Sequence, residues 1–290
     1  MSDALQQLVA QYTSSGTRPE NALREVVQHL ALLGLWRSGF YRDAAFYGGT
    51  ALRIFYGLDR FSEDMDFSLL TAETACDLTP HLNAIRKELE GFGLKFSVQR
   101  KGKSSKSAIE SAFLKGNTVQ NLLTIDLSLA DGAGIHRHQT CKIKLEVDTD
   151  PPAGALFEMK TLLVPIPFQV RLFSLPDLFA GKLHAVLCRG WKSRVKGRDY
   201  YDLVWYIGRN VPCHLSHLRQ RMIQSGHLRK EDKLDRAILI DMLHDRFGKV
   251  DFRQAAADVR PFVKDPDALK LWNQKFFEQV ILGIKVKSEE

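Results

Sequence analysis

The first half of the chain mixes helical and strand-like patterns of hydrophobic residues. Apolar residues recur at helical spacing over residues 3–13 and 20–37, which predicts two amphipathic helices. Short apolar runs bounded by Gly, Ser and charged residues then predict a series of strands. These strands are expected over residues 44–47, 65–69, 94–100, 109–115, 122–129 and 141–147.

Three further segments of this half have their own signals. Helices are expected over residues 50–57 and 71–89, although Pro80 disturbs the second of them. Residues 162–173 are expected to form an edge or irregular strand, because they contain Pro165 and Pro167.

The pattern changes after Ser174, where a Ser-Leu-Pro-Asp segment is typical of a helix start. Only helical periods occur beyond it, over residues 178–189, 200–207, 217–224, 233–247 and 269–282. We therefore expect an α+β fold. A mixed β-sheet core with flanking helices would occupy residues 1–175, and a C-terminal helical bundle would occupy residues 176–290.

Composition excludes several classes of protein. The chain has 290 residues, of which 44% are hydrophobic and 17 are Phe, so it is not intrinsically disordered. Its longest apolar run, residues 30–36, is far shorter than the roughly 18 residues of a membrane span. The first residues lack the features of a secretory signal. Four scattered cysteines without a C-x-x-C motif favour a reducing cytoplasm over a disulfide framework.

Two glycines between a predicted strand and a predicted helix form the first candidate site. Gly48 and Gly49 allow the backbone to approach a phosphate closely. The helix that starts near Thr50 directs its free N–H groups and the positive end of its dipole at the same anion. A Gly-Gly pair alone usually marks only a turn, so its meaning depends on the neighbouring acidic residues.

The second candidate site is a pair of carboxylates. Asp64 and Asp66 are two positions apart on a predicted strand, so both leave the same face. Mg²⁺ would relieve their mutual repulsion, because carboxylate oxygens are its preferred ligands. We expect Glu146 to be the third metal ligand, with Asp148 and Asp126 as alternatives. Glycines followed by paired acids are suited to phosphoryl or nucleotidyl transfer, in which two metals hold the attacking and leaving oxygens.

Basic residues are concentrated in two segments without acids, residues 95–106 and 182–198, within a net charge of 41 − 34 = +7. Lys and Arg neutralise phosphates, so we expect an RNA acceptor to bind here. The candidate RNA-binding residues are Lys101, Lys103, Lys192, Arg194 and Lys196, with Trp191 as a stacking platform. The competing interpretation is that these segments are simply solvated faces.

The later helices contain a third group of candidates. Lys182 and Arg189 are seven positions apart and therefore share one helical face. Arg198 and Asp202 have the spacing of an ordinary surface salt bridge. The aromatic residues of that helix are expected to be packing residues: Tyr200, Tyr201, Trp205 and Tyr206.

Four segments in order across residues 47–205 resemble the AbiEii/AbiGii abortive-infection toxin family. The first two are Gly48-Gly49-Thr50-Ala51-Leu52 and Arg60-Phe61-Ser62-Glu63-Asp64-Met65-Asp66-Phe67. The others are Lys182-Leu183-His184-Ala185 with Arg189, and Arg198-Asp199-Tyr200-Tyr201-Asp202-Leu203. They are similar to the family's Lys-x-x-Ala-x-x-x-Arg and Arg-Asp-x-x-Asp-Leu motifs. His184 stands where no required residue is expected.

The resemblance implies a function and residue roles. It implies a Mg²⁺-dependent nucleotidyltransferase of the DNA polymerase beta superfamily, acting as a toxin of a phage-defence toxin–antitoxin pair with a separate antitoxin protein. Some relatives modify the 3′ end of tRNA. By the same resemblance, Gly48, Gly49 and Thr50 would hold the NTP triphosphate, and Arg60 and Ser62 would flank the nucleotide. Asp64 and Asp66 would bind Mg²⁺, and Lys182 would contact the nucleotide. Either Asp199 or Asp202 would be a candidate base or the partner of Lys182.

Two other functions are compatible with the same residues. A chain of this fold could have lost catalysis and kept only RNA binding, but a degenerate relative would be expected to lack at least one carboxylate. Alternatively, an active enzyme could modify a protein or a small molecule. An assay that follows transfer of label from an NTP distinguishes these functions. Transfer that is lost in Asp66→Ala would indicate an enzyme, and the molecule that carries the label would identify the acceptor.

Overall fold

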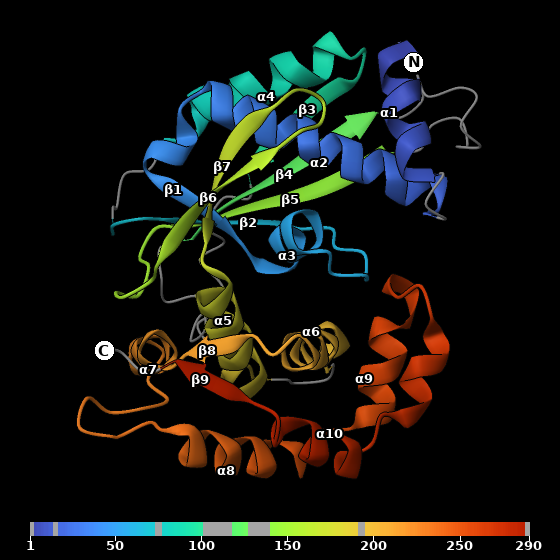
Figure 1. Ribbon diagram of the computed structural model, residues 1–290. Coiled ribbons are helices and arrows are strands. Elements are labelled where there is room, and N and C mark those ends of the chain that lie inside the picture. The colour runs from blue at the N-terminus through green and yellow to red at the C-terminus, as the bar shows by residue number, and fades with distance from the viewer. Residues whose placement is uncertain are drawn as a thin grey trace.

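The computed structural model describes residues 3–13, 17–72, 77–100, 118–126, 140–190 and 195–287, and consists of two lobes (Figure 1). Helices α1 (Asp3–Thr13) and α2 (Pro19–Arg37) begin the first lobe, as the apolar spacing predicts. Among the described residues, no helix has the length and apolar character needed to cross a bilayer.

A seven-stranded mixed sheet is the centre of the first lobe. Its spatial order is β3-β4-β5-β2-β1-β7-β6. The strands are β1 (Ala44–Tyr47), β2 (Met65–Leu69), β3 (Lys95–Arg100), β4 (Thr118–Asp126), β5 (Thr140–Asp148), β6 (Phe157–Leu162) and β7 (Phe168–Phe173). Strand β2 runs parallel to β5 and β1 runs parallel to β7, while the remaining neighbours are antiparallel. The predicted mixed sheet is thereby confirmed.

Helices cover the two faces of this sheet unequally. Helices α2 and α4 (Thr79–Gly91) pack on the outer face, and α3 (Gly48–Tyr56) lies on the side toward the second lobe (Figure 1). Gly34 allows close packing of the outer pair, because a Cβ there would lie 2.7 Å from the Cα atom of Ile85. The core between helices and sheet contains fully buried Phe46 and Phe67, whose rings stack.

The second lobe is helical, as expected. It comprises α5 (Leu175–Cys188), α6 (Gly197–Gly208), α7 (Leu215–Gln224), α8 (Arg236–Phe247), α9 (Phe252–Val259) and α10 (Gln274–Ile281), with the short strands β8 (Pro212–His214) and β9 (Lys285–Lys287) and the 3-10 helices η3 (Arg260–Phe262) and η4 (Pro266–Leu271). Its core also includes Ala45, Leu52 and Phe173 of the first lobe. The two lobes therefore share one hydrophobic junction, and the boundary at residue 175 stays a prediction.

Strand β4 begins at Thr118 and not at residue 122, and most of β6 was not predicted. Three other predicted elements differ from those observed, each for a local reason. Helix α4 begins at Thr79, not residue 71, because Pro80 is favourable only in a first turn. Residues 162–173 form the end of β6, a turn containing Pro165 and Pro167, and β7. The helix expected over 269–282 is interrupted at Asn273, whose side chain caps α10 by accepting a hydrogen bond from the Phe276 amide at 2.9 Å.

Other differences concern small elements. Helix α9 and the parallel pair β8–β9 were not predicted, because each is too short to give a clear periodic signal. The strand predicted over residues 109–115 lies outside the described residues.

Candidate active site

A cavity of about 330 Å³ lies where the two lobes meet. Its walls come from the β1–α3 junction, the ends of β2 and β5, and helices α5, α6 and α7. The predicted site residues that line it are Gly48, Gly49, Arg60, Ser62, Asp64, Asp66, Glu146, Lys182, Arg189, Lys196 and Asp199. Motifs that are far apart in sequence therefore surround one space.

The two glycines are required by close contacts at the start of α3. Gly48 has a φ of +82°, and a Cβ there would collide with the Asp66 carboxylate. A Cβ on Gly49 would lie 2.7 Å from Nη2 of Arg60 and 3.0 Å from Oγ of Ser62. Thr50 is not among the described lining residues, and its hydroxyl instead donates to the backbone carbonyl of Asp64. This bond joins the helix start to the strand of carboxylates.

The carboxylates lie on adjacent parallel strands. Asp66 of β2 is directly opposite Glu146 of β5, and Asp64 immediately precedes β2. Burial, together with the negative charges of Glu146 and Asp64, raises the pKa of Asp66 to about 7. Lys144 pairs with Glu146 at 2.6 Å and offsets part of this repulsion. The group is thus rich in negative charge that only a cation would relieve fully.

The sheet register separates the alternatives for the third carboxylate. Glu146 faces Asp66, and Asp148, one step further along the same face of β5, also lines the cavity. Asp126 lies opposite Thr140, whereas the β4 residue opposite Glu146 is Gln120. Six strand positions correspond to about 20 Å, so Asp126 is far from the other acids.

Buried ion pairs connect the first lobe to α5 and α6. Arg60 donates to both oxygens of Asp202, from Nε and Nη2 at 2.6 Å each. Lys182 lies 2.8 Å from both Asp199 and Asp202. Asp202 is fully buried and, among the described residues, is not part of the cavity wall. From this position Asp202 can hold Arg60 and Lys182 in place, but it does not face a substrate in the cavity.

Asp199 is the acid between two cavity cations. It pairs with Lys182 and, at 2.6 Å, with Nη1 of Arg189. Burial would raise its pKa, but Lys182 and Arg189 outweigh burial and lower the pKa to about 2. Asp199 is therefore a carboxylate at neutral pH, which fits a partner of Lys182 better than a proton acceptor.

Several interpretations of the basic and aromatic residues can now be checked. The expected Arg198–Asp202 surface pair is wrong, because Asp202 binds Arg60 and the Arg198 guanidinium lies over the Phe262 ring at 4.5 Å. Tyr200 and Tyr206 are buried packing residues, as predicted. Trp191 and four of the predicted RNA-binding residues lie outside the described residues: Lys101, Lys103, Lys192 and Arg194.

Sequence reasoning missed one cation of the cavity. Arg221 projects from α7 into the cavity wall, and its buried Nε atom has no hydrogen-bond partner among the described residues. Nothing in the sequence near Arg221 distinguishes it from other helical arginines. Only the packing of α7 against α5 reveals its position.

The carboxylate group fits a divalent metal ion. Asp64, Asp66 and Glu146 offer only hard oxygen donors, the type that Mg²⁺ prefers. Burial and, after it, the negative charges of Glu146 and Asp64 raise the pKa of Asp66, and a bound cation would offset both effects by favouring the carboxylate. The donor set and its electrostatics therefore match the predicted metal site.

Comparison with one solved structure supports the fold. The Helicobacter pylori protein JHP933 is 16% identical and aligns over 91% of this chain and 88% of its own, with a TM-score of 0.51. A candidate nucleotidyltransferase from H. pylori is also 16% identical, over 89% and 92% of the two chains, with a TM-score of 0.48. A comparison with curated proteins finds no significant match.

Comparison with protein families gives a more specific result. The family model described as nucleotidyl transferase AbiEii toxin, type IV toxin–antitoxin system, matches residues 30–276, which is most of the chain. The match includes all four motifs and all walls of the cavity. The chain therefore belongs to the AbiEii family of nucleotidyltransferase toxins.

Proposed function

We propose that this nucleotidyltransferase uses Mg²⁺ to transfer a nucleoside monophosphate from an NTP to the 3′ end of tRNA, with release of pyrophosphate. One observation carries the proposal. The glycine helix start, the paired acids and the Lys182 cluster, which the sequence separates, surround a single cavity. The cavity therefore combines a phosphate site, a metal site and the cationic side chains of Lys182 and Arg189.

The phosphate site is formed by α3 and α5. The first N–H groups of α3 have no partners within the helix, and the missing side chains of Gly48 and Gly49 let phosphate oxygens approach them. Lys182 of α5 and Arg189, directly after α5, face this region and are held by Asp199. These cations orient the triphosphate and neutralise the charge that develops on the departing pyrophosphate.

The metal site is formed by Asp64, Asp66 and Glu146. When bound, the metal neutralises charge on the attacking and leaving oxygens. The chain's own contribution is to hold the three carboxylates on two paired strands, where the register keeps Asp66 and Glu146 opposite each other. The alternative ligand Asp148 lies on the same face and would bind at the edge of this group.

An RNA acceptor is supported by the charge around the cavity. Lys196 and Arg198 lie on its wall beside Arg189, and no ion pair with a described carboxylate is found for either. Burial lowers the pKa of Lys196, and the neighbouring Arg189 lowers it further. Such a concentration of positive charge is stabilised by a polyanion. The family also implies a separate antitoxin protein as a partner of this toxin.

The experiment is a transfer assay with each of four labelled NTPs, Mg²⁺ and total tRNA. We expect label on tRNA with the wild-type protein and none with Asp66→Asn. Label on protein or a small molecule, with tRNA unmodified, would show that the acceptor is wrong. Undiminished tRNA binding without transfer to any acceptor would show that the chain is a binding module.

A further inference from the structure

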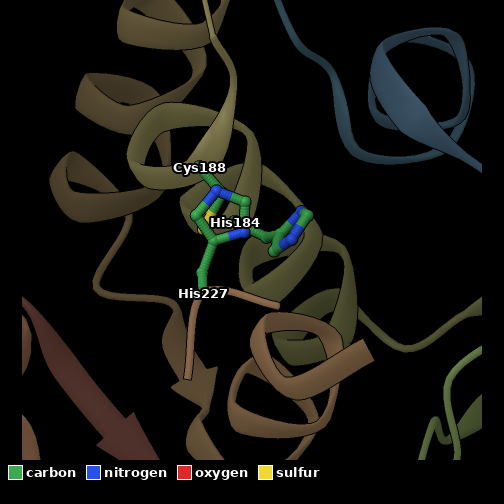
Figure 2. Close-up of side chains that lie close together, drawn as sticks. All are labelled: His184, Cys188 and His227. Carbon is green, nitrogen blue, oxygen red and sulfur yellow. The ribbon is translucent and has the colours of Figure 1, made fainter. Parts of the chain in front are cut away.

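A second cluster of metal-binding side chains lies on the helix that carries Lys182. His184 and Cys188 are one turn apart on α5, and His227 approaches them from the turn that comes after α7 (Figure 2). One nitrogen of each ring and the Cys188 sulfur all lie within 4.8 Å of one another. None of these residues belongs to the carboxylate group of the active site.

A serine hydroxyl holds the two imidazoles beside each other. The Ser225 Oγ atom is 2.9 Å from Nε2 of His184 and 2.9 Å from Nδ1 of His227. The two rings are almost perpendicular, at 86°, with their centroids 6.3 Å apart. The turn after α7 is therefore already positioned against α5 at this cluster.

The donor set indicates the class of metal. Two imidazoles and a thiolate suit Zn²⁺ and similar transition metals, whereas Mg²⁺ prefers oxygen ligands. We propose that His184, Cys188 and His227 bind one Zn²⁺-type ion, which fastens the turn after α7 to α5. Ligands of a tetrahedral zinc ion are about 3.5 Å apart, so the cluster must contract by about 1 Å. His227 is exposed and can supply this movement by rotating its side chain.

The arginines around the cluster favour metal binding by stabilising a neutral imidazole and a thiolate, and oppose it by repelling a cation. Burial and the nearby positive charge of Arg221 together lower the pKa of His184 to about 3, so the ring is neutral and able to bind metal at pH 7. Burial raises the pKa of the Cys188 thiol, Arg246 and Arg221 oppose this rise by favouring the thiolate, and the resulting pKa is about 12. These arginines also repel a cation. Binding consequently displaces the thiol proton to solvent, and the new metal–sulfur bond replaces the S–H bond.

The position of the cluster gives the ion a structural role. Helix α5 carries Lys182 before the cluster and leads to Arg189 after it, and α7 carries Arg221. A metal bound between α5 and the turn after α7 would hold together two walls of the cavity. This inference does not depend on the acceptor or on the transfer reaction.

The test uses Co²⁺ and Zn²⁺ as probes on the full chain, in excess Mg²⁺ to occupy the carboxylates. With wild-type protein we expect one Co²⁺ per chain, a sulfur-to-cobalt charge-transfer band, loss of the band on adding Zn²⁺, and a higher Tm with Zn²⁺. Cys188→Ser should abolish the band, and His227→Ala should weaken Zn²⁺ binding by about tenfold or more. The matched controls are Cys213→Ser, another buried cysteine, and His244→Ala, a histidine whose side chain is 41% exposed.

Both controls should behave as wild type. Absence of the band in wild-type protein overturns the proposal, as does a band that survives in Cys188→Ser or disappears in Cys213→Ser. If Cys188→Ser does not fold, His227→Ala decides the question, because His227 is exposed and its loss leaves no cavity in the core.

Discussion

Arg60 and Asp202 form a bidentate ion pair that is almost completely buried, although 142 positions separate them in the chain. Removing one member would leave the other charge buried without its partner. We therefore expect Asp202→Ala to reduce the free energy of unfolding by about 3–5 kcal/mol. Chemical denaturation measures this change.

Asp267→Ala is the control for that variant, because Asp267 pairs with Lys270 while both side chains are about three-quarters exposed. Its loss should cost at most about 1 kcal/mol. Equal effects of the two substitutions would contradict the importance assigned to the buried pair.

A methyl group at Gly48 should block the active site. Gly48→Ala places a Cβ against the Asp66 carboxylate and forces alanine into a φ of +82°. Gly57, at the other end of α3, has a similar φ of +73° but nothing within 4 Å of its missing Cβ. Both substitutions should cost about 1–2 kcal/mol of stability, and only Gly48→Ala should abolish nucleotidyl transfer. Transfer by Gly48→Ala at the rate of Gly57→Ala would refute the role of this close contact.

The sheet register predicts which acids matter for transfer. Glu146→Gln should lower the transfer rate by about a hundredfold or more, because it removes a carboxylate opposite Asp66. Asp126→Asn should leave the rate unchanged, since Asp126 lies at the other end of the β4–β5 pairing. Steady-state transfer rates at saturating NTP provide the measurement, with circular dichroism to verify folding. The reverse order of effects would mean that the third ligand is wrongly assigned.

Asp199 should make the free energy of unfolding depend on pH. Its pKa is lowered from 3.8 to about 2 in the folded chain, so the unfolded chain binds more protons between these values. The stabilisation, about 2 kcal/mol, is complete above pH 4 and is lost as the pH falls toward 2. Denaturation of wild type and Asp199→Asn across this range should give curves that converge at low pH. Parallel curves would show that the Asp199 pairs do not contribute.

Lys196 should contribute to RNA affinity through its charge alone. Lys196→Gln is expected to weaken tRNA binding and to reduce the slope of log K against log salt by about 0.7–0.9. Lys87→Gln is a suitable control, because Lys87 is exposed on α4, on the far side of the sheet (Figure 1). Fluorescence anisotropy at several salt concentrations measures both variants. An unchanged slope for Lys196→Gln would argue against a phosphate contact.

Local patterns predicted the elements that position the site. The predicted bounds of β1 and β2 agree with those observed, because each is a short apolar run between turn residues. The predicted helix over 71–89 began too early, since apolar spacing gave no sign that α4 starts only at Thr79. Pairing between strands also lay beyond the sequence, so Asp126 could not be separated from Glu146 before the register was known.

The contacts of the active site were predictable only in part. Motif spacing indicated that Lys182 and Arg189 share a face, and they meet at Asp199. Long-range packing decided the rest: Asp202 is directed to Arg60 and not to Arg198, and Arg221 enters the cavity from α7. The approach of His227 to Cys188 depends on the same packing, since 39 positions separate these residues.

The connection from Arg60 to Asp202 also affects when activity can arise during synthesis. The glycines and the Asp64–Asp66 pair leave the ribosome well before the chain reaches Lys182, Asp199 and Asp202. Until then Arg60 has no carboxylate to hold it, and the phosphate site lacks its cations from α5. The active-site cavity therefore cannot be complete in a nascent chain until the second lobe has been synthesised and has folded against the first.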